Sequence, residues 1–363
     1  MPEYAGVEAT STLVTHAAVL SGPDLVLLDR AAVLMAGGRI VSVSGGDATD
    51  VPDGAEVVDA RGLLLVPGFV DAHVHIAFAD PAEVLRRGVT TVRDLGWPEE
   101  EIFALARSSR VPDFDGPLIL AVGPIVTAPG GYPTRAAWAP PGTGRAVTTR
   151  TEAEETVGHL ETAGAVAVKV ALNPPVGPVL PRDTLQALVE AAHRRGLLVT
   201  GHVHGADELD KALDCGVDEL AHMLMSPEEI PDATIRRMVA DGMVVVPTLS
   251  IFAGRDREIA ISNVARFRRA GGRVVYGTDL GNEGPRPGID PGEIGSLAEA
   301  GFSSLEIVAS ATTEAAHHLA LHSKGSLSPG KDADIVAVPV EALQQPEKLC
   351  DVRMVWREGR RAA

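Results

Sequence analysis

Residues 66–75 read Val66-Pro67-Gly68-Phe69-Val70-Asp71-Ala72-His73-Val74-His75, an apolar segment that ends in two histidines two positions apart. The residues from 62 to 70 are mostly apolar and show no helical period, which predicts a buried strand. Because side chains alternate between the faces of a strand, Asp71, His73 and His75 should point to the same side. Two convergent imidazole nitrogens suit a metal such as zinc, so a metal site is expected where this strand ends.

The composition limits the classes of protein to consider. The chain has 363 residues, of which 45% are hydrophobic, which favours one large domain with a small one. A net charge of −17, without a Lys/Arg-rich run, argues against a nucleic-acid partner. No segment is long enough to cross a membrane, and Met1 to Tyr4 do not begin a signal peptide. Cys215 and Cys350 form no disulfide pattern, so a cytoplasmic location is expected.

Both ends of the chain show the same sequence pattern, short β-type runs separated by turns. Such runs occupy residues 24–28 and 39–44 near the start, and 333–338 and 352–356 near the end. We therefore expect residues 1–65 and 325–363 to form one small all-β domain, a β-sandwich built from both termini.

The middle of the chain, residues 66–324, alternates strands with helices and predicts an α/β fold with parallel strands. The eight expected strands are 64–70, 89–94, 117–123, 165–171, 197–203, 218–222, 243–248 and 273–278. Helical patterns fill the gaps, for example at 151–163, 181–195, 206–215 and 227–241. Eight such units match the size of a (β/α)8 TIM barrel, in which catalytic residues lie at the carboxyl ends of the strands.

Metal-competent side chains stand at several of these strand ends. After His73 and His75, the chain places Lys169, His202, His204, His222 and Asp279 in or directly after expected strands. Four other histidines, His159, His193, His318 and His322, are expected at the surface or in packing roles, and His16 in the β domain. Asp71 is expected to hold the turn after the first strand.

These motifs closely resemble the amidohydrolase superfamily of metal-dependent hydrolases. The resemblance includes the opening at 67–75, the segment 88–94, the strand-end histidines, Gly277-Thr278-Asp279 and the tail at 324–334. Lys169 makes the chain similar to binuclear members such as imidazolonepropionase-like and Xaa-Pro dipeptidase-like hydrolases. The resemblance implies two divalent ions, with zinc favoured and manganese, iron or cobalt open. The implied ligands are His73, His75, Lys169, His202, His222 and Asp279.

Lys169 is also informative by itself, because valine and alanine flank it on both sides. Burial without a partner lowers the pKa of a lysine from about 10.4, and a neutral amine can take up CO2. The resemblance implies a carbamate of Lys169 that bridges the two ions. A lysine that reaches solvent, and a site with a single metal, remain alternatives.

The expected activity is hydrolysis of an amide or cyclic amide C–N bond. A bound metal lowers the pKa of water from about 15.7 to about 7, so a hydroxide bridging two ions would be the nucleophile. Asp279 would accept the proton and pass it to the leaving nitrogen, as general base and then general acid. Two alternatives are a lyase or isomerase on the same metal site and a non-catalytic scaffold protein.

The substrate side is predicted from loops at the expected mouth of the barrel. The loop at 124–148 is long and rich in glycine and proline, which favours a functional role. The expected substrate contacts are Tyr132, Trp138, Arg286, His204 and Arg93. For Arg93 an ion pair in the barrel wall, and for His204 a packing role at the mouth, are the alternatives.

Together with Arg135 and Arg145, Arg286 could attract a carboxylate, so a small amide with or without a carboxylate is the expected substrate. Dipeptidase-like relatives often have Gly-Gly-His where this chain has Gly130-Gly131-Tyr132, which argues against a dipeptide. The oligomeric state is left open, a homo-oligomer included.

Overall fold

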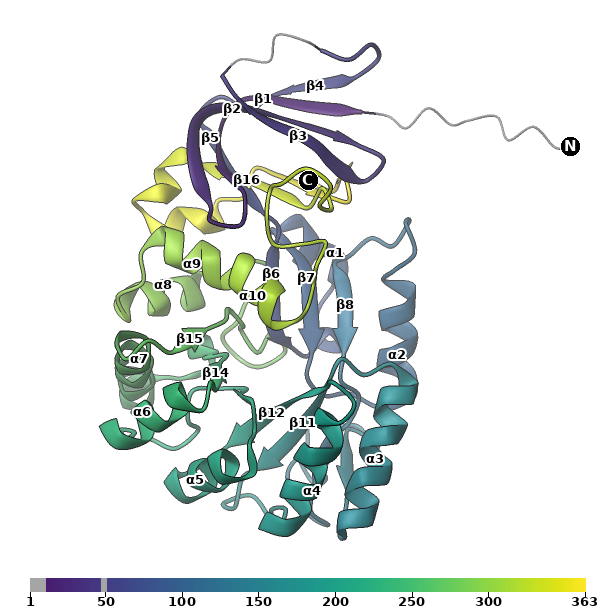
Figure 1. Cartoon of the computed structure of the whole chain (residues 1–363), viewed down its shortest axis with the longest axis vertical. Helices are drawn as coiled ribbons and strands as arrows, with labels where there is room; N and C mark the ends of the chain where they lie inside the picture. The colour runs from purple at the N-terminus through teal and green to yellow at the C-terminus, as the bar shows by residue number, and fades with distance from the viewer. Residues whose placement is uncertain (1–10, 47–50) are drawn as a thin grey trace, which may run out of the picture.

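A sheet built from the two chain ends lies against a larger layer of parallel strands and helices in the computed structural model (Figure 1). The structure describes residues 11–46 and 51–363. Residues 1–4, where no signal peptide is expected, therefore lie outside the described part. In that part, none of the helices combines the length and the apolar composition of a membrane span.

The terminal sheet has eight strands and takes them from both ends of the chain. Seven of them follow the order β18-β17-β16-β5-β1-β2-β3, and β4 pairs with β1. Their bounds are β1 (Thr12–Ser21), β2 (Val26–Ala36), β3 (Arg39–Gly45), β4 (Glu56–Asp59), β5 (Leu63–Pro67), β16 (Ile335–Pro339), β17 (Met354–Arg357) and β18 (Arg360–Arg361). Hydrogen bonds join all of these strands into one sheet. The expected β-sandwich would have two sheets, so that expectation is not met.

The apolar run expected as one strand at 64–70 is two strands in the structure. β5 ends at Pro67 and pairs antiparallel with β16, whereas β6 (Phe69–Val74) pairs parallel with β7 (Val89–Asp94). Gly68 lies between them, and the close approach of Thr90 requires a glycine, because a Cβ at this position would lie 2.2 Å from Thr90 Oγ1. The expected first strand is therefore wrong in its bounds, and the division into residues 1–65 with 325–363 and residues 66–324 stays a prediction.

The parallel strands form two sheets in chain order. One has the order β6-β7-β8 and the other the order β10-β9-β11-β12-β13-β14-β15. Their remaining bounds are β8 (Leu118–Ala121), β9 (Ile125–Thr127), β10 (Gly144–Ala146), β11 (Ala167–Leu172), β12 (Leu198–Val203), β13 (Glu219–Leu220), β14 (Val244–Val245) and β15 (Arg273–Val274).

Backbone hydrogen bonds also join the edges of these two sheets. Val166 N donates to Ala121 O at 3.0 Å, which links the segment before β11 to β8. Ala72 N donates to Tyr276 O at 3.0 Å, which links β6 to the segment after β15. These links and the strand order are consistent with the expected (β/α)8 barrel.

The helices follow the strands as the sequence pattern predicts. They are α1 (Pro81–Arg86), α2 (Glu99–Ser108), α3 (Arg150–Ala163), α4 (Arg182–His193), α5 (Ala206–Cys215), α6 (Asp232–Ala240), α7 (Gly254–Arg269), α8 (Pro291–Glu299), α9 (Ser304–Ala311) and α10 (Thr313–His318), with short 3-10 turns η1 (Ile76–Phe78), η2 (Leu249–Ile251), η3 (Val340–Leu343) and η4 (Pro346–Cys350).

Local signals explain where individual helices begin and end. A capping box of Thr149 with Glu152 starts α3, and Gly164 ends it in a left-handed conformation. α6 begins five residues after the expected start at 227, because Pro231 occupies its N-cap position with an extended backbone.

Candidate metal centre

Asp71 joins the first parallel strand to the segment that follows the last one. Its Oδ1 accepts from the backbone N–H groups of His73 and Thr278, both at 3.1 Å, and its Oδ2 accepts from Thr278 Oγ1 at 2.6 Å. Burial raises the pKa of Asp71 to about 7, although these hydrogen bonds oppose the shift. This carboxylate therefore brings the His73 end of β6 and the Asp279 segment together.

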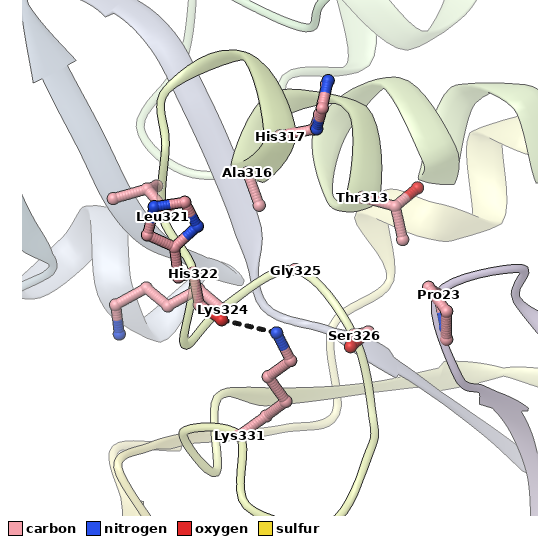
Figure 2. Close-up of a pocket in the computed structure, with 10 residues that line it drawn as sticks. All are labelled: Pro23, Thr313, Ala316, His317, Leu321, His322, Lys324, Gly325, Ser326 and Lys331. Atoms are coloured by element: carbon pink, nitrogen blue, oxygen red, sulfur yellow. Dashed lines mark hydrogen bonds between the residues drawn. The ribbon is translucent and has the colours of Figure 1, made fainter.

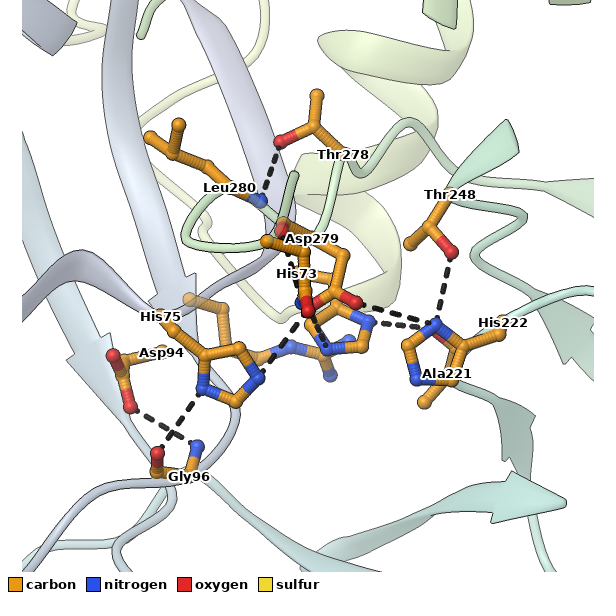
Figure 3. A network of polar contacts seen from close by, with 12 residues as sticks. His73, His75, Asp94, Gly96, Ala221, His222, Thr248, Thr278, Asp279 and Leu280 are labelled. Atoms are coloured by element: carbon orange, nitrogen blue, oxygen red, sulfur yellow. Dashed lines mark hydrogen bonds and ion pairs between the residues drawn. The ribbon is translucent and has the colours of Figure 1, made fainter. Parts of the chain in front are cut away.

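Three histidines surround Asp279 (Figure 3). Asp279 Oδ1 lies 3.2 Å from His73 Nε2 and 3.3 Å from His75 Nε2, and its Oδ2 lies 3.8 Å from His222 Nδ1. His73, His222 and Asp279 each offer a ligand atom, and these atoms lie within 4.8 Å of one another. All four side chains are buried, so the structure brings together residues from three distant parts of the chain.

The two histidines of β6 are oriented by main-chain carbonyls. His73 Nδ1 donates to Ala221 O at 2.5 Å, and His75 Nδ1 donates to Gly96 O at 3.1 Å. A carbonyl oxygen only accepts, so the proton of each ring is on Nδ1 and the lone pair is on Nε2. This second hydrogen bond is the usual way in which a metal-binding histidine is held.

Lys169 lies in the middle of β11 with 2% of its surface exposed. Among the described residues, its Nζ has no hydrogen-bond partner. Burial lowers the pKa of this amine to about 7, although the carboxylates of Asp279 and Glu219 oppose the shift. A near-neutral, unpaired amine in this position is suited to take up CO2.

The buried atoms without a partner fit a metal ion. Within the described part of the chain, His73 Nε2 and Asp279 Oδ1 form no hydrogen bond of acceptable geometry despite their short distance, and Lys169 Nζ has none either. Buried polar groups are normally paired, so three such atoms in one place call for an explanation. A nitrogen, a carboxylate oxygen and an amine that can become a carbamate are ligands that a divalent ion would satisfy.

The pKa values of three of the four candidate ligand histidines fit the same conclusion. Burial lowers the pKa of His73 and His222 well below the usual range, and it lowers that of His202 to about 3, with the charge of Lys169 adding to each shift. Burial also opposes charging of His75, but Asp279 and Asp94 outweigh it and raise its pKa. Neutral imidazoles are the form that binds metal.

His202, at the end of β12, lies beside His222 with ring centroids 4.9 Å apart. Its Nε2 lies 3.0 Å from Asn173 Nδ2, while Asn173 Oδ1 has no partner among the described residues. If the amide were turned over, Oδ1 would accept from Nε2 and leave Nδ1 available as a ligand. His204 follows on the same strand end and is half-buried.

The structure brings Tyr132 and Trp138 to the same place. The Tyr132 ring stacks on His202, with centroids 4.9 Å apart and planes inclined by 27°. The Trp138 ring lies 5.4 Å from that of His75. Both aromatic residues of the 124–148 loop therefore contact candidate ligand histidines.

Arg93 is engaged within the sheet layer. It is fully buried, its Nη2 donates to Glu219 Oε1 at 2.6 Å, and its Nε donates to Ala72 O at 2.8 Å. These contacts favour the ion-pair interpretation over a substrate contact.

The structure does not bring Arg286 to the site either. It lines a cavity of about 340 Å³ with Arg86 and Arg87. Ile289 N donates to Arg87 O at 3.0 Å, so this part of the loop lies at the amino end of β7. The candidate ligands lie at the opposite, carboxyl ends of the strands, and a sequence cannot show that the loop after Asp279 leaves the mouth.

Several residues around the site were not expected. His318 Nε2 donates to Glu219 Oε2 at 2.5 Å, so this histidine supports the Arg93–Glu219 pair from α10. Thr248 Oγ1 lies 2.9 Å from His222 Nδ1, and its place at the end of an expected strand was a usable signal. No sequence signal distinguishes Phe78, Trp97 or Asn173.

A separate cavity of about 240 Å³ lies between α10, the loop after it and the turn at Pro23 (Figure 2). His317 and His322 line it, and Lys331 Nζ donates to His322 O at 2.5 Å. It contains none of the candidate metal residues, which agrees with the minor role expected for His322.

Known proteins resemble this chain along most of its length. It is 26% identical to imidazolonepropionase of Deinococcus deserti, over 93% of both chains, and 25% identical to 5-methylthioadenosine/S-adenosylhomocysteine deaminase of Symbiobacterium thermophilum, over 86% of this chain and 81% of the relative. The crystal structure of a Xaa-Pro dipeptidase superposes with a TM-score of 0.81 at 22% identity, over 97% of this chain and 99% of the other. That of phenylurea hydrolase B superposes with a TM-score of 0.79 at 22% identity, over 97% and 96%.

Residues 64–362 match the model of the amidohydrolase family, a segment that includes every candidate ligand. The protein therefore belongs to the amidohydrolase family and is an enzyme of that family, a hydrolase of carbon–nitrogen bonds.

Proposed function

We propose that the protein is a metal-dependent hydrolase that cleaves an amide or cyclic amide C–N bond, with its site at the mouth of a closed (β/α)8 barrel. The observation that carries this proposal is the convergence of His73, His75, His222 and Asp279 with the unpaired, buried amine of Lys169. The imidazolonepropionase and Xaa-Pro dipeptidase similarities support the same class of reaction.

The proposed ligands hold two divalent ions, with zinc favoured. They are His73, His75, Lys169 as its carbamate, His202, His222 and Asp279. When bound, these ions supply Lewis-acid polarisation of the scissile carbonyl and an activated water.

The chain's own residues then manage the proton. Asp279 is 3% exposed and has Oδ1 beside the two histidines of β6, so its carboxylate is held in one orientation by the fold. It accepts a proton from the attacking water and delivers it to the leaving nitrogen. We expect His204, which follows β12, and Tyr132, which stacks on His202, to contact the substrate.

Elemental analysis tests the metal part of the proposal. Protein purified without chelator and supplied with zinc and bicarbonate should contain about two divalent ions per chain. His193→Ala is a matched control, since His193 is exposed and pairs with Asp218, and it should keep both ions. Protein that stays metal-free after this treatment would overturn the assignment.

Product analysis in ¹⁸O-labelled water tests the reaction. Amide, lactam, N-acyl amino acid and carbamate libraries provide the substrates, and hydrolysis places the label in the acid product. A product without label would identify a lyase or an isomerase on the same site instead.

A further inference from the structure

Four aromatic side chains form a continuous group beside the candidate ligands, here called the aromatic wall. It consists of Phe78, Trp97, Tyr132 and Trp138. Phe78 lies 4.9 Å from Trp97 and 6.3 Å from Trp138, and Trp138 lies 6.1 Å from Tyr132, measured between ring centroids. The chain has only 13 aromatic residues of these three types, so four of them in one group is a concentration.

The wall leads from solvent to the metal centre. Phe78 is 47% exposed and stands three residues after His75. At the other end, Trp138 lies against His75 and Tyr132 stacks on His202. The wall therefore presents aromatic surface directly beside the candidate ligands His75 and His202.

The cations expected at the mouth are engaged elsewhere. Arg93 is buried on Glu219, Arg286 lies at the amino end of β7, and Arg145 lies 3.7 Å from Glu99. Arg135 is exposed, with its guanidinium beside Gly130. Three of the four arginines that could attract a substrate carboxylate are therefore paired with an acidic residue or lie away from the candidate ligands.

We infer that the preferred substrate is an uncharged amide that carries a flat apolar group, aromatic in the simplest case, next to the scissile carbonyl. This inference rests on the proposed function and specifies the substrate of that site. The reaction consumes one water: the C–N bond breaks, a C–O bond forms, and the amine leaves with the proton that Asp279 delivers. The flat group packs against Trp138 and Tyr132, where contact between aromatic rings is favourable beyond the area that it buries.

Three matched amides separate the ring from the charge. N-ethyl phenylacetamide has the ring and no charge, N-ethylpropionamide lacks the ring, and N-phenylacetylglycine adds a carboxylate. We expect kcat/KM of the zinc-loaded enzyme to be at least about tenfold higher for the first compound than for either of the others.

Wall variants test which residues carry this preference. Trp138→Ala and Phe78→Ala should each lower kcat/KM for the aromatic amide by about tenfold, mainly through KM, while zinc content stays unchanged. Trp138→Phe should restore most of the loss. Phe114→Ala is the matched control, because Phe114 is half-buried near the amino end of β8 and should change neither value.

Binding gives a second readout that does not require turnover. Trp97 and Trp138 lie in the wall and Trp356 lies in the terminal sheet, so tryptophan quenching by the aromatic amide should fall severalfold with Trp138→Ala, and Trp97 should account for the quenching that remains. Equal quenching by all three amides, or a preference for N-phenylacetylglycine that Arg135→Ala removes, would overturn the inference. Loss of zinc from the wild type would instead overturn the proposed function.

Discussion

Lys169 tests whether the site holds two ions. Lys169→Ala removes the proposed bridging ligand, so the ion count should fall from about two to one or none, and activity should fall with it. Short carboxylic acids such as acetate should restore part of both, because the deletion leaves space beside His73 and Asp279. Lys169→Met, which fills that space without an amine, should show the loss but no rescue. Unchanged metal content in both variants would favour a single-metal site of His73, His75, His202 and Asp279.

Thr248 is a second residue whose role can be isolated. It has a left-handed backbone with φ of 46°, which is uncommon for a β-branched residue, and its hydroxyl lies on His222 Nδ1. Partners of this kind affect metal affinity by about 10–100-fold. Zinc titration should show a loss in that range for Thr248→Val and nearly normal affinity for Thr248→Ser. Equal affinities for the two variants would show that the hydroxyl does not orient His222.

The sequence predicted the site residues unevenly, for physical reasons. His73, Lys169, His202 and Asp279 could be predicted to lie near one another because strand ends at one edge of a parallel sheet must converge. Loop residues follow no such rule. Arg286 lies away from the site because its loop turns back along the outside, and Phe78 was missed because a single exposed phenylalanine has no pattern around it.

At the scale of elements, a buried network ties four of the parallel strands together. Glu219 on β13 accepts from Arg93 on β7 and from Thr200 on β12, and Arg93 donates to Ala72 O on β6. Burial opposes ionisation of Glu219, but Arg93 and His318 outweigh it and lower its pKa to about 2. The network therefore holds β6, β12 and β13 together a few residues before the candidate ligands His73, His202 and His222.

Breaking this network should destabilise the fold strongly. Glu219→Gln leaves the buried Arg93 without its counter-charge, and such changes cost about 3–5 kcal/mol. Asp115→Asn in the exposed Arg86–Asp115 pair is the control and should change stability by less than about 1 kcal/mol. The free energy of unfolding from urea titrations measures both. A similar small change in the two variants would contradict the role assigned to the network.

The start of α8 provides a pH-dependent element. Burial raises the pKa of Glu293 to about 8, against the hydrogen bonds from Ser250. Below about pH 4.5, Glu293 is protonated in both the folded and the unfolded chain. In that range the protonated Glu293 makes its full contribution to the free energy of unfolding. This stabilisation is lost as the pH rises from about 4.5 to 8, because Glu293 releases its proton in the unfolded chain and keeps it in the folded chain.

Glu293→Gln should remove this dependence. Relative to the wild type, the variant should gain stability steadily between pH 5 and pH 8 and show no further gain above that. Unfolding titrations of both proteins at pH 5, 6.5, 8 and 9 measure the difference. A difference that does not vary with pH would mean that Glu293 titrates normally.

Element boundaries show where sequence patterns stop being informative. The run at 64–70 is uniformly apolar, yet it contributes to two different sheets that meet at Gly68. The spacing of apolar residues indicates which residues are buried but not which strand they pair with. It therefore cannot predict that β5 and β6 divide at Gly68. The short strands β13, β14 and β15 were predicted longer for the same reason, since buried segments stay apolar beyond their ladder hydrogen bonds.

At the scale of the whole molecule, the terminal sheet is attached through buried charged side chains. Lys324 Nζ lies 2.7 Å from Asp334 and 3.0 Å from Asp332, and Arg357 donates to the backbone carbonyls of Ser109 and Gly116. The two chain ends share a pattern of short β-type runs, which predicted that they form one domain. The contacts of Arg357 with the parallel layer join residues more than 200 positions apart, which no local pattern shows.

The proposed metal centre should therefore stabilise the entire fold, because its proposed ligands lie on or directly after β6, β11, β12, β13 and β15. An ion held by these residues binds only the folded chain, and at a thousandfold excess over its dissociation constant this adds about 4 kcal/mol. We expect chelator-treated protein to unfold several degrees below the zinc-loaded form in calorimetry. His73→Ala should abolish the difference, whereas His193→Ala, in an exposed pair on α4, should preserve it. If the wild type unfolds at one temperature with and without zinc, the ligands are not joined through an ion.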